Sequence, residues 1–151
     1  MLSHIDNLLS GIGGAEIVMT VARIATGTFF VFSGYNKLFN KGRHQSLIET
    51  FKADHIPFIR FNQWWVPSVE FVGGLAIVIG LLTVPAAMAL IILLTVAMAT
   101  DGYKRVRAYA PIDDSDYVDD WLYLSEVTYI ILLAIFMTAG AGAFSVDALL
   151  F

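Results

Sequence analysis

Long uninterrupted apolar stretches dominate the hydrophobic pattern of this chain. Four of them cover about residues 17–39, 65–82, 85–100 and 121–139. Each approaches the roughly 20 apolar residues that a helix needs to cross a hydrocarbon core. Because apolar residues cover all sides of these segments, the pattern predicts membrane spans rather than surface helices of a soluble protein. We therefore expect an all-α membrane protein, an up-down four-helix transmembrane bundle that forms a single domain over residues 1–151.

Two of the predicted connections are long. Residues 40–63 mix apolar and polar positions ahead of two adjacent tryptophans. This pattern predicts an amphipathic interfacial segment between the first two spans, broken near Pro57 and anchored by the tryptophans. Residues 101–120 are polar and end in aspartates that suit the N-terminal cap of the fourth helix. The expected capping residues are Asp119 and Asp120.

Composition and charge agree with a membrane location. Hydrophobic residues make up 58% of the chain and charged residues only 15%, whereas a soluble domain carries about a quarter charged residues. Eight of the nine lysines and arginines fall at the first and third connections, and only Arg23 lies elsewhere. The positive-inside rule then predicts a multi-pass protein of the inner (plasma) membrane, with these two connections cytoplasmic and both termini outside. The first residues lack a basic n-region, so we interpret them as an uncleaved interfacial segment.

Cofactor chemistry on the chain itself is restricted. There is no cysteine, which excludes disulfides, thiolate metal sites and iron–sulfur clusters held by this chain alone. His4, His44 and His55 lie outside the predicted spans, whereas haem needs axial ligands held at depth in a bundle. The acidic run at 113–120 lacks the glycine and terminal glutamate of a calcium loop. We expect no metal, no covalently bound cofactor and no nucleic-acid partner.

Charged residues inside the spans are the candidate chemistry, since each costs at least ~2.5 kcal/mol at the bilayer centre. By helical rise, Glu70 and Glu126 lie roughly 8 Å from the cytoplasmic side, and Arg23 lies roughly 9 Å from the outer side. We therefore expect Arg23 to snorkel toward Asp147 in a structural ion pair, and Lys37 to serve as the cation for Glu70 or Glu126. The polar side chains expected to converge on the cytoplasmic half are Tyr35, Asn36, Lys37, Glu70, Asp101, Tyr123 and Glu126.

Two interpretations of this cytoplasmic polar group stay open. In one, it is a satisfied ion pair with an extra carboxylate and is purely structural. In the other, it is a pocket for a quinone headgroup or part of a proton path, because a quinone ring needs hydrogen bonds while its tail stays in lipid. The residues alone favour the structural interpretation, and they assign no catalytic residue. Glycines at five positions predict close packing between helices: Gly27, Gly34, Gly73, Gly74 and Gly80.

Three motifs lie in order along the chain. Residues 23–38 carry an arginine followed by G-x-x-F and then S-G-x-x-K-L. Residues 67–83 run from P-S-V-E-F-V-G-G to G-L-L-T, and residues 140–147 read G-x-G-x-x-S-x-D. Together these motifs resemble the DoxX family of small bacterial and archaeal membrane proteins. Ala143 stands where that family often has an arginine, which weakens the case for an anionic ligand at the last motif.

The resemblance implies a quinone connection, because the family takes its name from a subunit of thiosulfate:quinone oxidoreductase. The leading hypothesis is an integral membrane subunit of a quinone-linked redox complex, non-catalytic or forming the quinone site, with cofactors carried by partner chains. Glu70, with Lys37 and Glu126, would then shape the headgroup site beside Tyr35 and Asn36. The alternative is a non-enzymatic scaffold that anchors a partner protein, and either role allows a homo-oligomer. A small transporter is disfavoured, since no repeat or broken helix is visible.

Overall fold

The computed structural model describes residues 14–108, 121–122 and 124–150, and this part of the chain contains helices and no strand. The all-α prediction is therefore confirmed. The helices are α2 (Gly14–Phe39), α3 (Lys41–Ala53), α4 (Ile59–Ile79), α5 (Thr83–Ala97), the π-helix η1 (Met98–Gly102), α6 (Tyr103–Ala108), α8 (Ser125–Ala139) and α9 (Asp147–Leu150).

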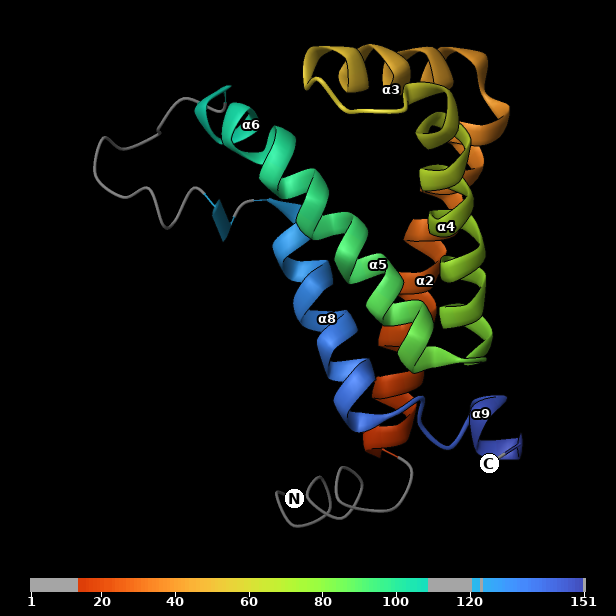
Figure 1. Ribbon diagram of the computed structural model, residues 1–151. Helices are drawn as coiled ribbons and strands as arrows, with labels where there is room; N and C mark the ends of the chain where they lie inside the picture. The colour runs from red at the N-terminus through yellow and green to blue at the C-terminus, as the bar shows by residue number, and fades with distance from the viewer. Residues whose placement is uncertain (1–13, 109–120, 123, 151) are drawn as a thin grey trace.

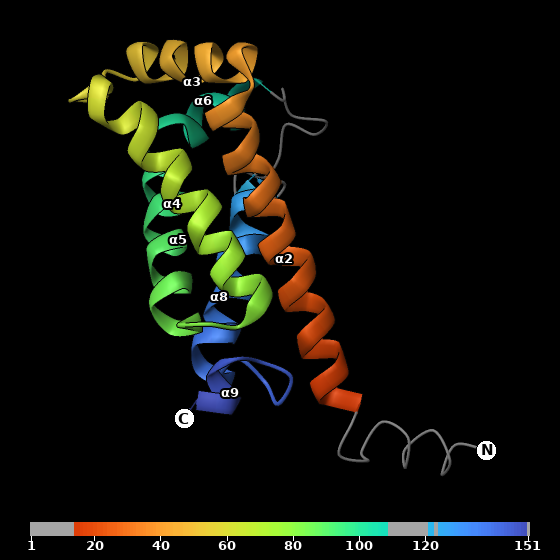
Figure 2. The same cartoon turned by 90° about the vertical axis from the view of Figure 1, so that its right-hand side faces the viewer.

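The long helices α2, α4, α5 and α8 lie side by side and alternate in direction (Figures 1 and 2). Helix α3 crosses the end of α2 and α4, and α6 lies at this same end of the molecule (Figure 2). The turn between α4 and α5, the start of α2 and the short α9 lie at the opposite end (Figure 1). The two basic connections of the chain thus share one end of the structure.

Within the described part of the chain, two helices are long and apolar enough to cross a membrane, namely Gly14–Phe39 and Thr83–Gly102. Helix α8 is also apolar but has only 15 residues. Large hydrophobic side chains face outward along these helices, among them Phe32, Ile92 and Ile131. An exterior of this kind is unfavourable in water and suits a hydrocarbon solvent.

Helices α2 and α4 make the most extensive contact of any pair, because glycines let their backbones approach. A Cβ added at Gly34 would stand 2.5 Å from the backbone nitrogen of Phe71, and one added at Gly74 would stand 2.7 Å from that of Val31. On the other side of α4, Gly73 packs against Leu90 of α5. The buried core at the centre of the helices consists of Phe30, Ile77, Ala87, Leu90, Leu133 and Phe136.

The ends of the helices differ in part from the predicted spans. Helix α4 begins at Ile59, so the chain segment predicted as interfacial over 40–63 consists of α3, a turn and the first residues of α4. The break falls beside Pro57, where His55 and Phe58 adopt positive φ angles. Asn40 starts α3 by accepting hydrogen bonds from the backbone at its N-terminus. None of the residues of α3 is buried. The predicted caps Asp119 and Asp120 lie outside the described residues.

Candidate functional site

The first charged cluster joins α2 to α4. The ammonium of Lys37 lies 2.7 Å from both carboxylate oxygens of Glu70, and the Ser33 hydroxyl donates to Glu70 Oε2 at 3.1 Å. Ser33 and Lys37 are four residues apart and therefore share one face of α2. The close backbone contact at Gly34, between them, brings this face against α4. The Glu70 side chain is only 13% exposed, so its charge is compensated by Lys37 rather than by solvent.

The second charged cluster joins η1 and α6 to α8. Arg105 Nη1 lies 2.7 Å from Glu126 Oε1, and Arg105 Nε lies 3.0 Å from Asp101 Oδ2. Lys37 therefore pairs with Glu70, whereas Glu126 takes its cation from α6. Sequence reasoning placed Arg105 in a polar connection and missed this role. The four-residue spacing between Asp101 and Arg105 was a usable signal, because such pairs meet on a helix surface.

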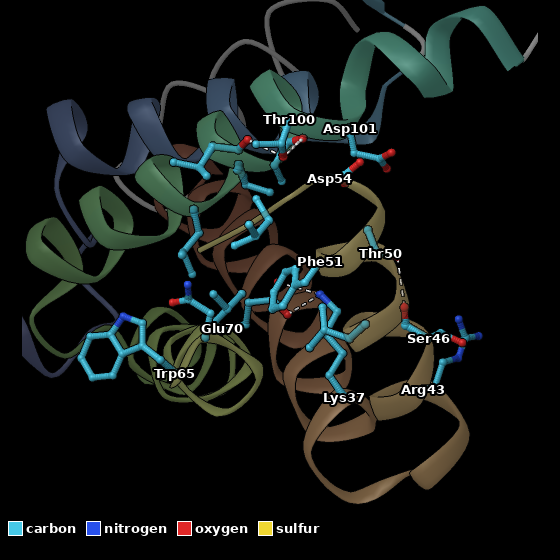
Figure 3. Close-up of a pocket in the computed structure, with 18 of the residues that line it drawn as sticks. Lys37, Arg43, Ser46, Thr50, Phe51, Asp54, Trp65, Glu70, Thr100 and Asp101 are labelled. Atoms are coloured by element: carbon cyan, nitrogen blue, oxygen red, sulfur yellow. Dashed lines mark hydrogen bonds and ion pairs between the residues drawn. The ribbon is translucent and has the colours of Figure 1, made fainter. Parts of the chain in front are cut away.

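A cavity of about 510 Å³ lies between the two clusters and beneath α3 (Figure 3). Its walls are apolar over much of their area, with Phe51, Trp65 and Leu94 among them. The charged side chains that line it are three basic and three acidic residues, so its formal charge is balanced: Lys37, Arg43, Arg105, Asp54, Glu70 and Asp101. The π-helix contributes Thr100 and Asp101 to the lining. Such a single-turn widening of a helix is frequent at functional sites.

Helix α3 forms the cover of this cavity. Leu47, Thr50 and Phe51 line the cavity from α3, and Figure 3 shows Phe51 beside the Lys37–Glu70 pair. The C-terminal end of α3 is tied to α6, because Lys104 forms an ion pair with Asp54 and also donates to the carbonyl of Ala53. The Asp54 side chain is only 3% exposed. Side-chain contacts at its ends, rather than a buried apolar face, thus hold the cover in place.

The remaining residues of the predicted polar group do not join the cavity. Tyr35 is half exposed and contacts the ring of Phe39, with the ring centroids 4.9 Å apart. Asn36 is exposed and lines a separate groove on the outer side of α2. Tyr123 lies outside the described residues. Of the predicted group, Lys37, Glu70 and Asp101 line the cavity, whereas Glu126 does not line it and pairs with Arg105, which does.

At the opposite end, Arg23 and Asp147 do not form the direct ion pair that was expected. Arg23 donates to the carbonyls of Ile77 and Val78 at 3.2 Å and to that of Phe144 at 2.6 Å. The first two carbonyls belong to the last turn of α4 and the third to the segment before α9, so the guanidinium ties these two segments together. The carbonyl of Ile77 also accepts from the backbone N–H of Gly80.

Asp147 binds the N-terminus of the adjacent helix, α5. Its carboxylate accepts from the backbone N–H groups of Leu82 and Thr83 at 2.7 and 2.9 Å, and so caps α5 from a distant part of the chain. Burial by itself raises the pKa of Asp147, but the backbone hydrogen bonds from Thr83 and Leu82 and the charge of Arg23 outweigh it and hold this pKa below its ordinary value. Arg23 and Asp147 thus both stabilise the junction between α4 and α5, and each does so by hydrogen bonding to backbone groups.

The histidines take part in local structure. The Nδ1 atom of His44 lies 2.8 Å from the backbone carbonyl oxygen of Lys37. The His44 ring packs on Trp64, with the ring centroids 4.5 Å apart. His55 follows the end of α3 with a positive φ. His4 lies outside the described residues. Among the described residues, no three histidine, aspartate or glutamate side chains are grouped so as to hold a metal ion.

A family model described as DoxX matches residues 18–101, which is more than half of the chain. The matched region contains the first two sequence motifs, the Lys37–Glu70 pair and most of the cavity lining. The third motif, at 140–147, lies beyond it. No curated protein and no solved structure is significantly similar to the chain.

Proposed function

The chain belongs to the DoxX family of membrane proteins, and from this premise we propose that it is an integral membrane subunit of a quinone-linked redox complex whose other cofactors are carried by partner chains. In this proposal α2, α4, α5 with η1, and α8 all cross the bilayer of the inner membrane. The end with α3 and α6 faces the cytoplasm, because the unpaired basic residues gather there, and both termini lie outside.

The observation that carries the proposal is the cavity beneath α3. Its volume of about 510 Å³ falls in the range of small-molecule sites, and such sites combine apolar walls with a few placed polar groups. Its charges are balanced and largely paired, which favours a neutral headgroup over an anionic one. A quinone ring is neutral, flat and apolar except for its carbonyl oxygens, so this lining fits it.

Individual residues take distinct roles in this proposal. The Lys37 ammonium has three donors, and those not used by Glu70 can bind a headgroup carbonyl. Phe51 and Trp65 bound the space in which the ring would lie. Glu70 holds Lys37 in position, and its carboxylate is the nearest group that can accept a proton from Lys37 or from water. When bound, a quinone supplies two-electron redox chemistry that no side chain of this chain can provide.

Quinone binding by the purified protein tests the proposal. The chain in mild detergent is titrated with a short-chain quinone, and tryptophan fluorescence reports binding through Trp65. We expect saturable quenching in the wild type and at least tenfold weaker binding in Lys37→Gln. Lys52→Gln is the matched control, because Lys52 is an exposed lysine of α3 outside the cavity lining. Equal binding by all three proteins, or no saturable binding by any, would contradict the quinone site.

A specific observation favours a second candidate, the non-enzymatic scaffold. Glu70, Asp101, Glu126 and Asp54 each have a cation partner, which is also the pattern of a purely structural network. The discriminating experiment is gentle purification from native membranes, with the co-purifying proteins identified by mass spectrometry. A redox enzyme in fixed proportion, together with bound quinone, supports the redox subunit. A non-redox partner, with no quinone present, supports the scaffold.

A further inference from the structure

A second hollow lies along α2 and meets the covered cavity at Lys37 and Arg43. This groove has a volume of about 500 Å³. Its wall follows one stripe of α2, since Ala25, Phe29, Phe32 and Asn36 are spaced by three or four residues. At 1.5 Å per residue the stripe is roughly 16 Å long. The full lining is Ala25, Thr28, Phe29, Phe32, Ser33, Asn36, Lys37 and Arg43.

The polarity of the groove changes along its length. The part toward the middle of α2 is formed by Ala25, Phe29 and Phe32, whereas the part next to α3 is formed by Asn36, Lys37 and Arg43. Lys37 is neutralised by Glu70, as described above. The guanidinium of Arg43 is exposed and makes no hydrogen bond or ion pair with any described residue. The groove therefore has an apolar length and a net positive end.

We propose that this groove binds one anionic phospholipid, with its phosphate at Arg43 and an acyl chain along α2. The charge of Arg43 selects a headgroup with net negative charge, and the Asn36 amide adds a hydrogen-bond donor. The apolar length selects a lipid over a soluble anion. The groove ends at the level of α3, where Trp64 and Trp65 lie on the neighbouring helix and are half exposed. Tryptophans of this kind sit at headgroup level, so a bound phosphate would lie at its normal depth.

This site is distinct from the proposed quinone site in the ligand that it takes. Apart from Arg43, which both hollows share, every charged side chain that lines the cavity is paired, and a neutral ring suits it. The groove contains no acidic side chain, and Arg43 is its unpaired cation. Lys37 and Arg43 line both hollows. A direct measurement of bound lipid is therefore needed, because a change in redox activity would not separate the two sites.

Native mass spectrometry of the detergent-purified protein provides this measurement. The protein is titrated with phosphatidylglycerol and with phosphatidylcholine of identical acyl chains. We expect one tightly retained phosphatidylglycerol, bound about fivefold more tightly than phosphatidylcholine, since one basic side chain near a membrane surface contributes that order of selectivity. Arg43→Gln should abolish the fivefold preference. Lys52→Gln should retain it, because Lys52 is on the same helix but outside the groove.

Two further experiments distinguish lipid binding in the groove from general attraction to surface charge and from a site that binds only phosphate. Ala25→Trp fills the apolar length while leaving every charge in place, and it should weaken both lipids severalfold. Glycerol phosphate, which has the headgroup chemistry without acyl chains, should displace bound phosphatidylglycerol only at far higher concentration. The proposal is overturned by equal retention of the two lipids in the wild type. It is also overturned by equal losses in Arg43→Gln and Lys52→Gln, or by efficient displacement with glycerol phosphate.

Discussion

Gly34 lies against the backbone of α4, and replacing this glycine with alanine gives a sharp test of the packing between α2 and α4. The added Cβ would stand 2.5 Å from the backbone nitrogen of Phe71 and 2.7 Å from the carbonyl oxygen of Pro67. Ordinary van der Waals contact begins at about 3.4 Å. Because both neighbours are backbone atoms, no side chain can turn away, and α2 must move from α4 by roughly 0.9 Å.

The cost of Gly34→Ala follows from two opposing terms. Overpacking of a well-packed contact costs about 1–3 kcal/mol, and a backbone clash belongs at the upper end of that range. Alanine is about 1 kcal/mol better than glycine as a helix former, which offsets part of the loss. We therefore expect the free energy of unfolding to fall by about 1–2 kcal/mol. The 3.1 Å hydrogen bond from Ser33 to Glu70 should also be lost, since it spans the same two helices.

The assay is reversible denaturation in mixed micelles, followed by circular dichroism. Gly42→Ala is the matched control, because a Cβ at Gly42 meets only the Asn40 side chain, at 3.4 Å. Gly42→Ala replaces a helical glycine with alanine in the same way but introduces no clash. Its free energy of unfolding should therefore equal that of the wild type or exceed it by up to about 1 kcal/mol. Equal free energies of unfolding for Gly34→Ala and Gly42→Ala would contradict the close backbone contact between α2 and α4.

Three other changes test the remaining charged groups. Glu70→Gln leaves Lys37 without its carboxylate and should destabilise the protein by about 1.5–3 kcal/mol, the range for hydrogen bonds to charged groups, because the pair is only partly buried; an unchanged denaturation midpoint would contradict the pairing. Lys104→Gln releases α3 from α6 and should raise the rate at which a maleimide labels Thr100→Cys inside the cavity. The chain has no other cysteine, so the label is specific, and an unchanged rate would show that Lys104 does not hold the cover. Asp147 has a lowered pKa in the folded protein, so its stabilising effect is present above the ordinary value of about 3.9 and is lost as the pH falls through the folded pKa. The stability difference between wild type and Asp147→Asn should therefore shrink below about pH 4, and a constant difference would refute the capping role.

The sequence by itself determined the class of the protein. Continuous apolarity, scarce charge and glycine spacing are local properties, and each predicts helices that pack closely in a lipid environment. The three motifs at 23–38, 67–83 and 140–147 pointed to the family, and the match over 18–101, which contains the first two, confirms the membership. Depth along a helix is also a local property, because it follows from the rise per residue. For this reason the sequence could separate Arg23 from Glu70.

Only the tertiary structure decided which charged groups meet. Hydropathy places a residue along a helix but says little about the rotation of that helix or about which of several cations reaches a given carboxylate. Glu126 accordingly binds Arg105 rather than Lys37. Arg23 and Asp147 bind the backbone of the α4–α5 junction rather than each other, because unsatisfied carbonyl and N–H groups at helix ends compete for the same side chains. The cover formed by α3 likewise depends on a contact between segments far apart in the chain, the ion pair of Asp54 with Lys104.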